Sequence, residues 1–193
     1  MKPGLLIILS GPSGVGKGTI RKRIMEDESL HLSYSVSMTT RSKRNSEIDG
    51  KDYLFVDAST FQSAIDQDNL LEWAEFVGNR YGTPKAVVER LRQLGKNVLL
   101  EIEINGAKQV IAKTMGPGLV TIFLMPPSFE ALEARIRKRK TEPEAIIQER
   151  LEKAKREMNL HHDYQYLVIN DHLERAAEQI KQIIKERMQS MPQ

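Results

Sequence analysis

The chain has 193 residues, of which 40% are hydrophobic and 28% are charged, and its formal net charge at pH 7 is +3. These values are ordinary for one folded domain with a sizeable core, and so small a net charge does not by itself indicate a nucleic-acid partner. Because the chain contains no cysteine, disulfides and thiolate metal sites are excluded.

The N-terminal apolar run covers only residues 5–9 and ends in Ser10-Gly11-Pro12, without the small-residue cleavage site of a signal peptide. No stretch approaches the roughly 20 apolar residues that a membrane-spanning helix needs. We therefore expect a soluble, cytoplasmic protein that binds neither membrane nor nucleic acid. The oligomeric state is left open.

Short apolar runs alternate with helical patterns along most of the chain. Residues 5–9 predict a strand buried on both faces, followed by a glycine-rich turn and a helix over residues 16–26. The same patterns predict strands at 97–102, 119–124 and 166–169, and helices at 84–94, 106–115, 128–140, 143–160 and 173–188. This alternation predicts an α/β fold with a parallel sheet covered on both faces.

Residues 33–83 show a different pattern, with short segments of mixed aromatic and polar residues separated by turns. They predict a small mixed β lobe inserted between the first helix and the rest of the sheet. Residues 135–141 are dense in charge and poor in apolar side chains, which is typical of a flap rather than a core element.

The strongest chemical signal is a glycine-rich loop between the first strand and the first helix. Its glycines allow the backbone to present N–H groups to an anion, and the positive end of the following helix adds to the attraction. Lys17 supplies a positive charge for the β- and γ-phosphates. Gly18 stands where a Ser or Thr usually follows the lysine, so Thr19 is the nearest hydroxyl for Mg²⁺, directly or through water. The loop comprises Gly11, Pro12, Ser13, Gly14, Val15, Gly16, Lys17, Gly18 and Thr19.

Further motifs resemble those of the guanylate kinase family of P-loop kinases along essentially the whole chain. They are Ser10–Thr19, Ser33–Arg41 with Arg44, Gly50–Tyr53, Leu71–Glu75, Gly78–Pro84 and Val168–Asp171. The resemblance implies one domain over residues 1–193 with a three-layer P-loop kinase core. The core would comprise residues 1–32, 84–127 and 159–193, the GMP-binding lobe 33–83 and the helical lid 128–158.

The resemblance also implies the residues of a GMP site. Arg41 and Arg44, with Tyr53 and Tyr81, correspond to the clamp on the GMP phosphate, and two guanidinium forks suit a dianion. Glu72 corresponds to the residue that reads guanine, because a carboxylate accepts both N1–H and N2–H while adenine lacks these donors. The guanine edge would also contact Ser37 and Thr83.

The apolar strand continues through residues 98–103 and ends in two acids, Glu101 and Glu103, which stand two residues apart, so both are expected to point to the same face of the strand. The resemblance places them beside the acceptor and the magnesium. Glu103 stands where relatives usually carry Asp, and the additional methylene leaves open whether it contacts guanine N2 or metal-bound water.

The resemblance further implies catalytic arginines. Arg135 and Arg139 lie four residues apart on one helix face, and Arg150 joins them from the next helix to reach over the ATP phosphates. Lys140 replaces a usual glycine, and we expect altered lid kinetics from it. Asn170 corresponds to an adenine contact. The implied reaction is MgATP + GMP ⇌ ADP + GDP by in-line transfer in guanine nucleotide salvage and biosynthesis, with Mg²⁺ as cofactor and dGMP as a further acceptor.

Three alternatives remain open from the residues alone. A ribose-bisphosphate kinase would share the phosphate loop but would not need Glu72, Thr83 and two acceptor tyrosines. A non-catalytic guanylate-kinase-like module that binds phosphopeptides usually has a degraded phosphate loop, whereas Gly11–Thr19 is intact. A nucleic-acid binder would favour basic stripes interleaved with aromatic residues, and the sequence shows none.

Overall fold

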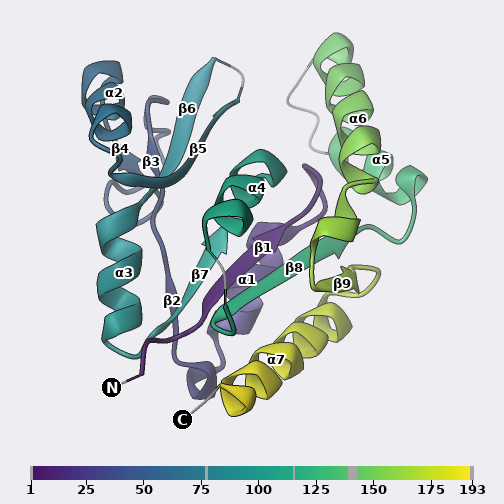
Figure 1. Ribbon diagram of the computed structural model, residues 1–193. Helices are drawn as coiled ribbons and strands as arrows, with labels where there is room; N and C mark the ends of the chain where they lie inside the picture. The colour runs from purple at the N-terminus through teal and green to yellow at the C-terminus, as the bar shows by residue number, and fades with distance from the viewer. Residues whose placement is uncertain (1, 77, 115, 139–142, 192–193) are drawn as a thin grey trace.

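The computed structural model describes residues 2–76, 78–114, 116–138 and 143–191. Its larger sheet contains β1 (Leu6–Ser10), β2 (Leu32–Tyr34), β7 (Asn97–Glu101), β8 (Leu119–Met125) and β9 (Tyr166–Ile169). The strand order is β2-β7-β1-β8-β9 and all neighbouring strands run parallel (Figure 1). The expected parallel α/β fold is confirmed.

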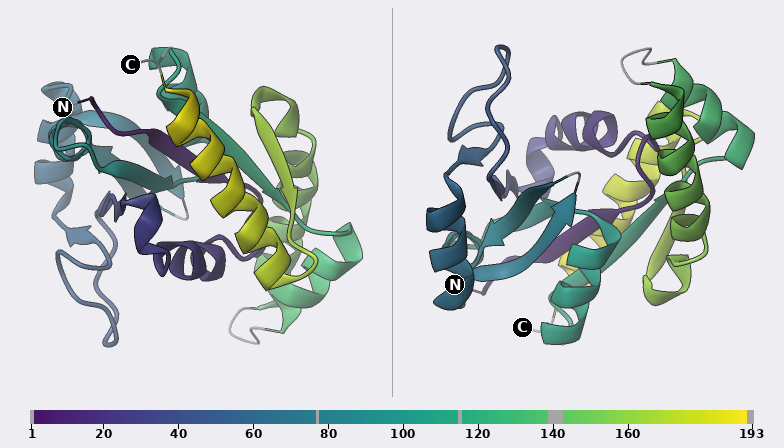
Figure 2. Two further views of the ribbon diagram at one scale, coloured as in Figure 1. Left: turned by 90° about the horizontal axis from the view of Figure 1, so that it is seen from below. Right: turned by 90° about the horizontal axis from the view of Figure 1, so that it is seen from above.

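Helices cover both faces of this sheet because the side chains of its central strand alternate between two buried clusters. Ile7 and Leu9 pack with residues of α1 and α7, whereas Leu6 and Ile8 pack with residues of α3 and α4. These helices are α1 (Lys17–Met25), α3 (Lys85–Gln93), α4 (Ile104–Lys113) and α7 (Leu173–Ser190). Figure 2 shows α1 and α4 on opposite sides of the sheet. The result is three layers with a core on each side of the sheet.

A second sheet of four strands forms the lobe. Its strands are β3 (Met38–Thr39), β4 (Leu54–Phe55), β5 (Leu70–Phe76) and β6 (Asn79–Pro84), in the order β4-β3-β6-β5. β5 and β6 are antiparallel and place Glu72 opposite Thr83. This segment also contains a helix, α2 (Ala58–Asp66). The sequence analysis predicted a β lobe here and no helix.

The beginning of the segment assigned to the lobe belongs to the larger sheet. Ser33 and Tyr34 of β2 pair with Val98 and Leu99 of β7. The partners are far apart in the sequence, so no local pattern indicates the pairing.

Two further helices are α5 (Phe129–Arg137) and α6 (Glu144–Met158). They lie near the carboxyl ends of the parallel strands, opposite the lobe (Figure 1). Ser128 caps α5 by accepting a hydrogen bond from the Ala131 N–H. Short 3₁₀ segments at Glu28–Leu30 and His161–Asp163 complete the described elements.

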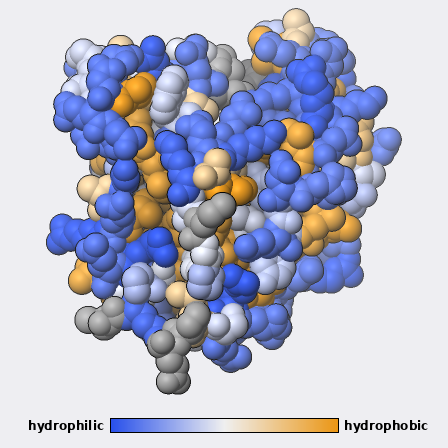
Figure 3. All heavy atoms as spheres, in the orientation of Figure 1, coloured by the Kyte–Doolittle hydropathy of each residue, from blue (hydrophilic) through white to orange (hydrophobic). Residues whose placement is uncertain are grey.

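Hydrophilic residues dominate the face shown in Figure 3, and hydrophobic residues show there only in small separate areas. Within the described ranges, no helix has both the length and the apolar character needed to cross a membrane.

Candidate functional site

The phosphate loop joins β1 to α1 and has the strained backbone that its glycines permit. Gly11, Gly14 and Gly16 have φ angles of 145°, 88° and 103°, all in the left-handed region. At Gly11 a Cβ would also lie 2.3 Å from the Leu124 carbonyl oxygen. The Lys17 ammonium donates to the carbonyl oxygens of Gly11 at 2.7 Å and Pro12 at 3.2 Å. Its enclosure lowers the pKa of Lys17, although Glu101 and Glu103 oppose the shift.

Arg135 ties α5 to this loop. Its guanidinium donates to the carbonyl oxygens of Val15 at 3.2 Å and Asn170 at 2.7 Å. The Asn170 amide donates to the same Val15 oxygen at 2.8 Å, and its side chain is buried. These three residues meet at the carboxyl ends of parallel strands, where α/β proteins commonly bind ligands.

α6 reaches the loop through Arg150, which donates to the Ser13 hydroxyl at 2.8 Å. Arg139 and Lys140 lie outside the described residues. Thr19, the predicted magnesium ligand, lines a pocket together with Gly16, Arg135 and Asn170. Arg135, Arg150 and Asn170 therefore come together at the phosphate loop, as the sequence predicts.

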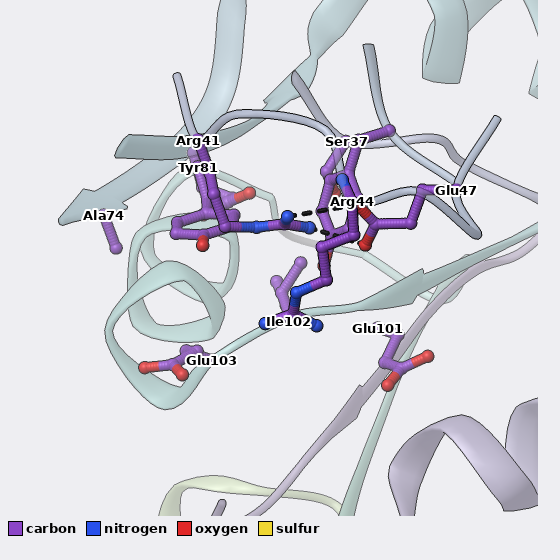
Figure 4. A pocket seen from close by; sticks show the side chains of 11 residues that line it. Ser37, Arg41, Arg44, Glu47, Ala74, Tyr81, Glu101, Ile102 and Glu103 are labelled. Atoms are coloured by element: carbon purple, nitrogen blue, oxygen red, sulfur yellow. Dashed lines mark hydrogen bonds and ion pairs between the residues drawn. The ribbon is translucent and has the colours of Figure 1, made fainter. Parts of the chain in front are cut away.

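A second cavity opens between the lobe and the carboxyl end of β7. In Figure 4, Arg41 and Arg44 project into it from the lobe, and Glu101 and Glu103 lie on its other side. Almost all the residues predicted for the acceptor site line it, and Thr83 lies directly behind Glu72. The lining residues are Ser37, Arg41, Arg44, Glu47, Tyr53, Glu72, Ala74, Tyr81, Glu101, Ile102 and Glu103.

Glu72 is a buried carboxyl group, 4% exposed, in the lining of this cavity. The Thr83 hydroxyl donates to one carboxyl oxygen at 2.6 Å. Burial raises the pKa of Glu72 to about 7, with the nearby Glu103 adding to the shift and the Thr83 hydrogen bond opposing it. The other oxygen lies against Gly106, so that a Cβ there would stand 2.2 Å from it. Gly106 thus leaves the space that the carboxyl group occupies.

Gln109 fixes strand β5, and with it Glu72, against α4. Its side-chain amide donates to the Trp73 carbonyl oxygen at 2.6 Å and accepts from the Trp73 N–H at 3.2 Å. The amide therefore acts as a neighbouring strand would at the edge of the small sheet.

Arg41 is held by Glu47, a residue that the sequence analysis did not select. Two Arg41 nitrogens donate to the two Glu47 oxygens at 3.0 and 2.6 Å, and the Arg44 N–H donates to Glu47 at 2.9 Å. The pair raises the pKa of Arg41 and lowers that of Glu47. The Tyr53 ring lies 5.4 Å from the Arg41 guanidinium and 5.9 Å edge-on from the Tyr81 ring. The available signal was an acid six residues after Arg41, close to the basic residues 41–44.

The geometry predicted for Glu101 and Glu103 needs correction. β7 ends at Glu101, and Glu103 is the residue before α4, so the two acids do not share one strand face. Both line the cavity, but Glu101 pairs with Arg21 at 2.8 Å and Glu103 pairs with Lys153 at 2.9 Å. β7 ends at Glu101 because α4 begins three residues later, at Ile104. The apolar run in the sequence does not indicate this end.

Comparison with known proteins identifies the family. The guanylate kinase family model matches residues 4–187. The chain belongs to the guanylate kinase family. It is 52% identical over 181 residues to a guanylate kinase of Bacillus cereus, with 94% of this chain and 87% of that protein covered. It is 50% identical over 184 residues to that of Mycoplasma mycoides, covering 95% of this chain and 61% of that longer protein.

A solved guanylate kinase structure from Anaplasma phagocytophilum has the same fold. Its TM-score is 0.78 at 32% identity, with 98% of this chain and 89% of that chain covered. The resemblance inferred from the motifs is therefore confirmed, and so is the assignment to the kinases, which are phosphotransferase enzymes. The roles of individual residues in this guanylate kinase family member stay predictions.

Proposed function

We propose that this chain transfers the γ-phosphoryl group of MgATP to GMP in the cytoplasm, forming ADP and GDP for guanine nucleotide salvage and biosynthesis, with dGMP as a further acceptor. The observation that carries the proposal is the buried Glu72 carboxyl group in a cavity that also contains Arg41, Arg44 and two tyrosines. A carboxylate there suits the N1–H and N2–H of guanine, and the arginines suit its phosphate.

The two nucleotides would meet above the carboxyl ends of β1 and β7. On the donor side, loop N–H groups and Lys17 hold the triphosphate, and Asn170 contacts adenine. On the acceptor side, Ser37 and Thr83 contact the guanine edge, and the arginines and tyrosines hold the phosphate. Arg135, Arg139 and Arg150 stabilise the charge on the migrating group, so catalysis is mainly positioning and electrostatics. Residues 33–83 and 128–158 would close over the core and exclude water.

The oxygen donors beside the phosphate loop fit Mg²⁺. An ideal Cβ at Gly18 lies 3.5 Å from a Glu101 carboxyl oxygen, so an acid stands beside the position where a hydroxyl is usual. Thr19 offers a hydroxyl from the next position of α1, where it lines a separate pocket with Arg135 and Asn170. Mg²⁺ needs only one or two protein ligands when it binds with nucleotide phosphates, whose charge it neutralises.

An acceptor panel tests the proposal. ADP formation from ATP is measured with GMP, dGMP, AMP, CMP, UMP and a ribose bisphosphate as acceptors, with and without Mg²⁺. Turnover with GMP and dGMP alone, dependent on Mg²⁺, is the expected result. Turnover with a ribose bisphosphate instead would favour the alternative kinase, and no turnover with any acceptor would favour a binding module.

Gly106→Ala should damage acceptor use selectively. The new Cβ would lie 2.2 Å from the Glu72 carboxyl oxygen, so the carboxyl group must leave the position in which it faces guanine. We expect the KM for GMP to rise about tenfold or more, which is the cost of roughly one charge-assisted hydrogen bond. The KM for ATP should change by less than about twofold.

Lys108→Ala, an exposed change on the same helix, is the matched control. Since alanine favours a helix over glycine, a wild-type KM for GMP with raised thermal stability would contradict this account of Gly106.

GMP binding should strengthen as pH rises through about 7. Burial raises the pKa of Glu72 to about 7 without ligand, and guanine donors require the carboxylate, so below that pH a proton must first leave. From pH 8 to pH 6 the ionised fraction falls about tenfold, and the KM for GMP should rise accordingly.

Because the GMP phosphate itself titrates near pH 6, the dependence of the KM for GMP on pH is measured for the wild type and for Glu72→Gln, and the two curves are compared. Only the wild type should show the step near pH 7, and superimposable profiles would rule out titration of Glu72.

A further inference from the structure

One face of α6 carries three charged residues directed at the two nucleotide sites. Arg150, Lys153 and Glu157 occupy positions i, i+3 and i+7, which share a helix face. Arg150 contacts the phosphate loop at Ser13, and Glu157 is 9% exposed and lies close enough to Lys17 to affect its pKa. The charged face of the lid helix α6 therefore packs against the phosphate loop.

Lys153 extends this face to the acceptor cavity. Its ammonium donates to a Glu103 carboxyl oxygen at 2.9 Å and lies 3.6 Å from a Glu157 carboxyl oxygen. Glu103 lines the acceptor cavity between β7 and α4, whereas Lys153 and Glu157 belong to the lid. One ammonium therefore bridges an acid of the acceptor site and an acid next to the phosphate loop.

The bridge depends on the length of the Glu103 side chain. Shortening it to Asp would withdraw the carboxylate by about 1.5 Å, one carbon–carbon bond. A 2.9 Å ion pair would then lie beyond 4 Å without a shift of the helix. The additional methylene of Glu103 accordingly serves contact with the lid.

We propose that Lys153 is a positioning residue that links the lid helix α6 to Glu103, so that nucleotide binding at the ATP site and GMP binding strengthen each other. The inference rests on the proposed function. The structure already joins Lys153 to Glu103. ATP bound against α6 would hold the helix in this position and so keep Glu103 ordered in the acceptor cavity, and GMP bound in that cavity would hold Glu103 and, through Lys153, keep α6 over the phosphate loop. Such coupling is reciprocal.

Calorimetric titration of GMP, with and without a non-hydrolysable ATP analogue, tests the inference. In the wild type the analogue should tighten GMP binding. In Lys153→Met this tightening should fall about two- to fivefold, the range for a partly exposed ion pair. The tightening of GMP binding by the analogue should fall by a similar factor in Glu103→Gln and in Glu103→Asp. In the double variant, Lys153→Met with Glu103→Gln, it should fall by no more than the larger of the two single losses.

Lys153→Arg should retain the coupling, and Lys155→Met, the same change on the exposed side of α6, should behave as the wild type. Wild-type coupling in Lys153→Met, multiplied losses in the double variant, or no effect of the analogue on wild-type GMP affinity would overturn the inference. Wild-type turnover with GMP is measured first, because its absence counts against the proposed function instead.

Discussion

Replacement of Glu72 by Gln is expected to lower kcat/KM for GMP by about 10²–10³-fold, while the KM for ATP stays within about twofold. In the proposed function the wild-type carboxylate accepts two guanine N–H groups, and a hydrogen bond to a charged group is worth about 1.5–3 kcal/mol. The glutamine amide presents one N–H to a guanine N–H, so one bond is replaced by a repulsive contact. Burial of Glu72 at 4% exposure excludes water that could compensate.

Steady-state kinetics with GMP and AMP measure this effect. The ratio of kcat/KM for GMP to kcat/KM for AMP should be smaller in Glu72→Gln than in the wild type. Glu75→Gln is the matched control, because Glu75 is exposed on the same strand, β5. A parallel loss of ATP and GMP use would mean that Glu72 supports the fold rather than reading the base. Circular dichroism and thermal unfolding of both variants separate these outcomes.

The fold could be predicted wherever sequence signals are local and strong. The apolar run of β1, the glycines at 11, 14 and 16 and the helix after them occur as expected. α2 was missed although its sequence carries helix signals: Ala58, Phe61 and Ile65 are spaced as on one helix face, and Asp57 caps the helix by accepting the Thr60 N–H. The helix is short and Phe61 is its only buried residue, so these signals were weak beside the strand patterns around it.

Site residues were predictable where their residue types alone suggest a ligand, and not where they act through a neighbour. Arg41, Arg44 and Glu72 gather in one cavity as the motifs imply. The partners that orient the site residues were not predicted: Glu47 holds Arg41 within one loop, Gln109 of α4 holds strand β5, and Lys153 of α6 contacts Glu103. Side-chain pairings of this kind depend on how elements pack, which a single sequence does not show.

Lys17→Met should lower kcat by about 10²–10³-fold, the cost of removing one preorganised charge from a phosphoryl-transfer site. The ammonium is held by two loop carbonyl oxygens at 2.7 and 3.2 Å, so the loop fixes its position and leaves one of its three N–H groups to donate to a phosphate. Methionine fills a similar volume but donates no hydrogen bond and carries no charge. Negative charge on the migrating phosphoryl group would then lose its nearest cation in the loop.

Single-turnover measurements at saturating ATP separate this loss of rate from weaker ATP binding. Lys22→Met, an exposed change on the same helix α1, provides the control for removing one positive charge. GMP affinity measured by calorimetry should be unchanged, because Lys17 does not line the acceptor cavity. If Lys17→Met kept the wild-type single-turnover rate, the glycine loop would bind phosphate without Lys17 taking part in its transfer, and catalysis would have to rest on Arg135 and Arg150, which contact the loop from α5 and α6.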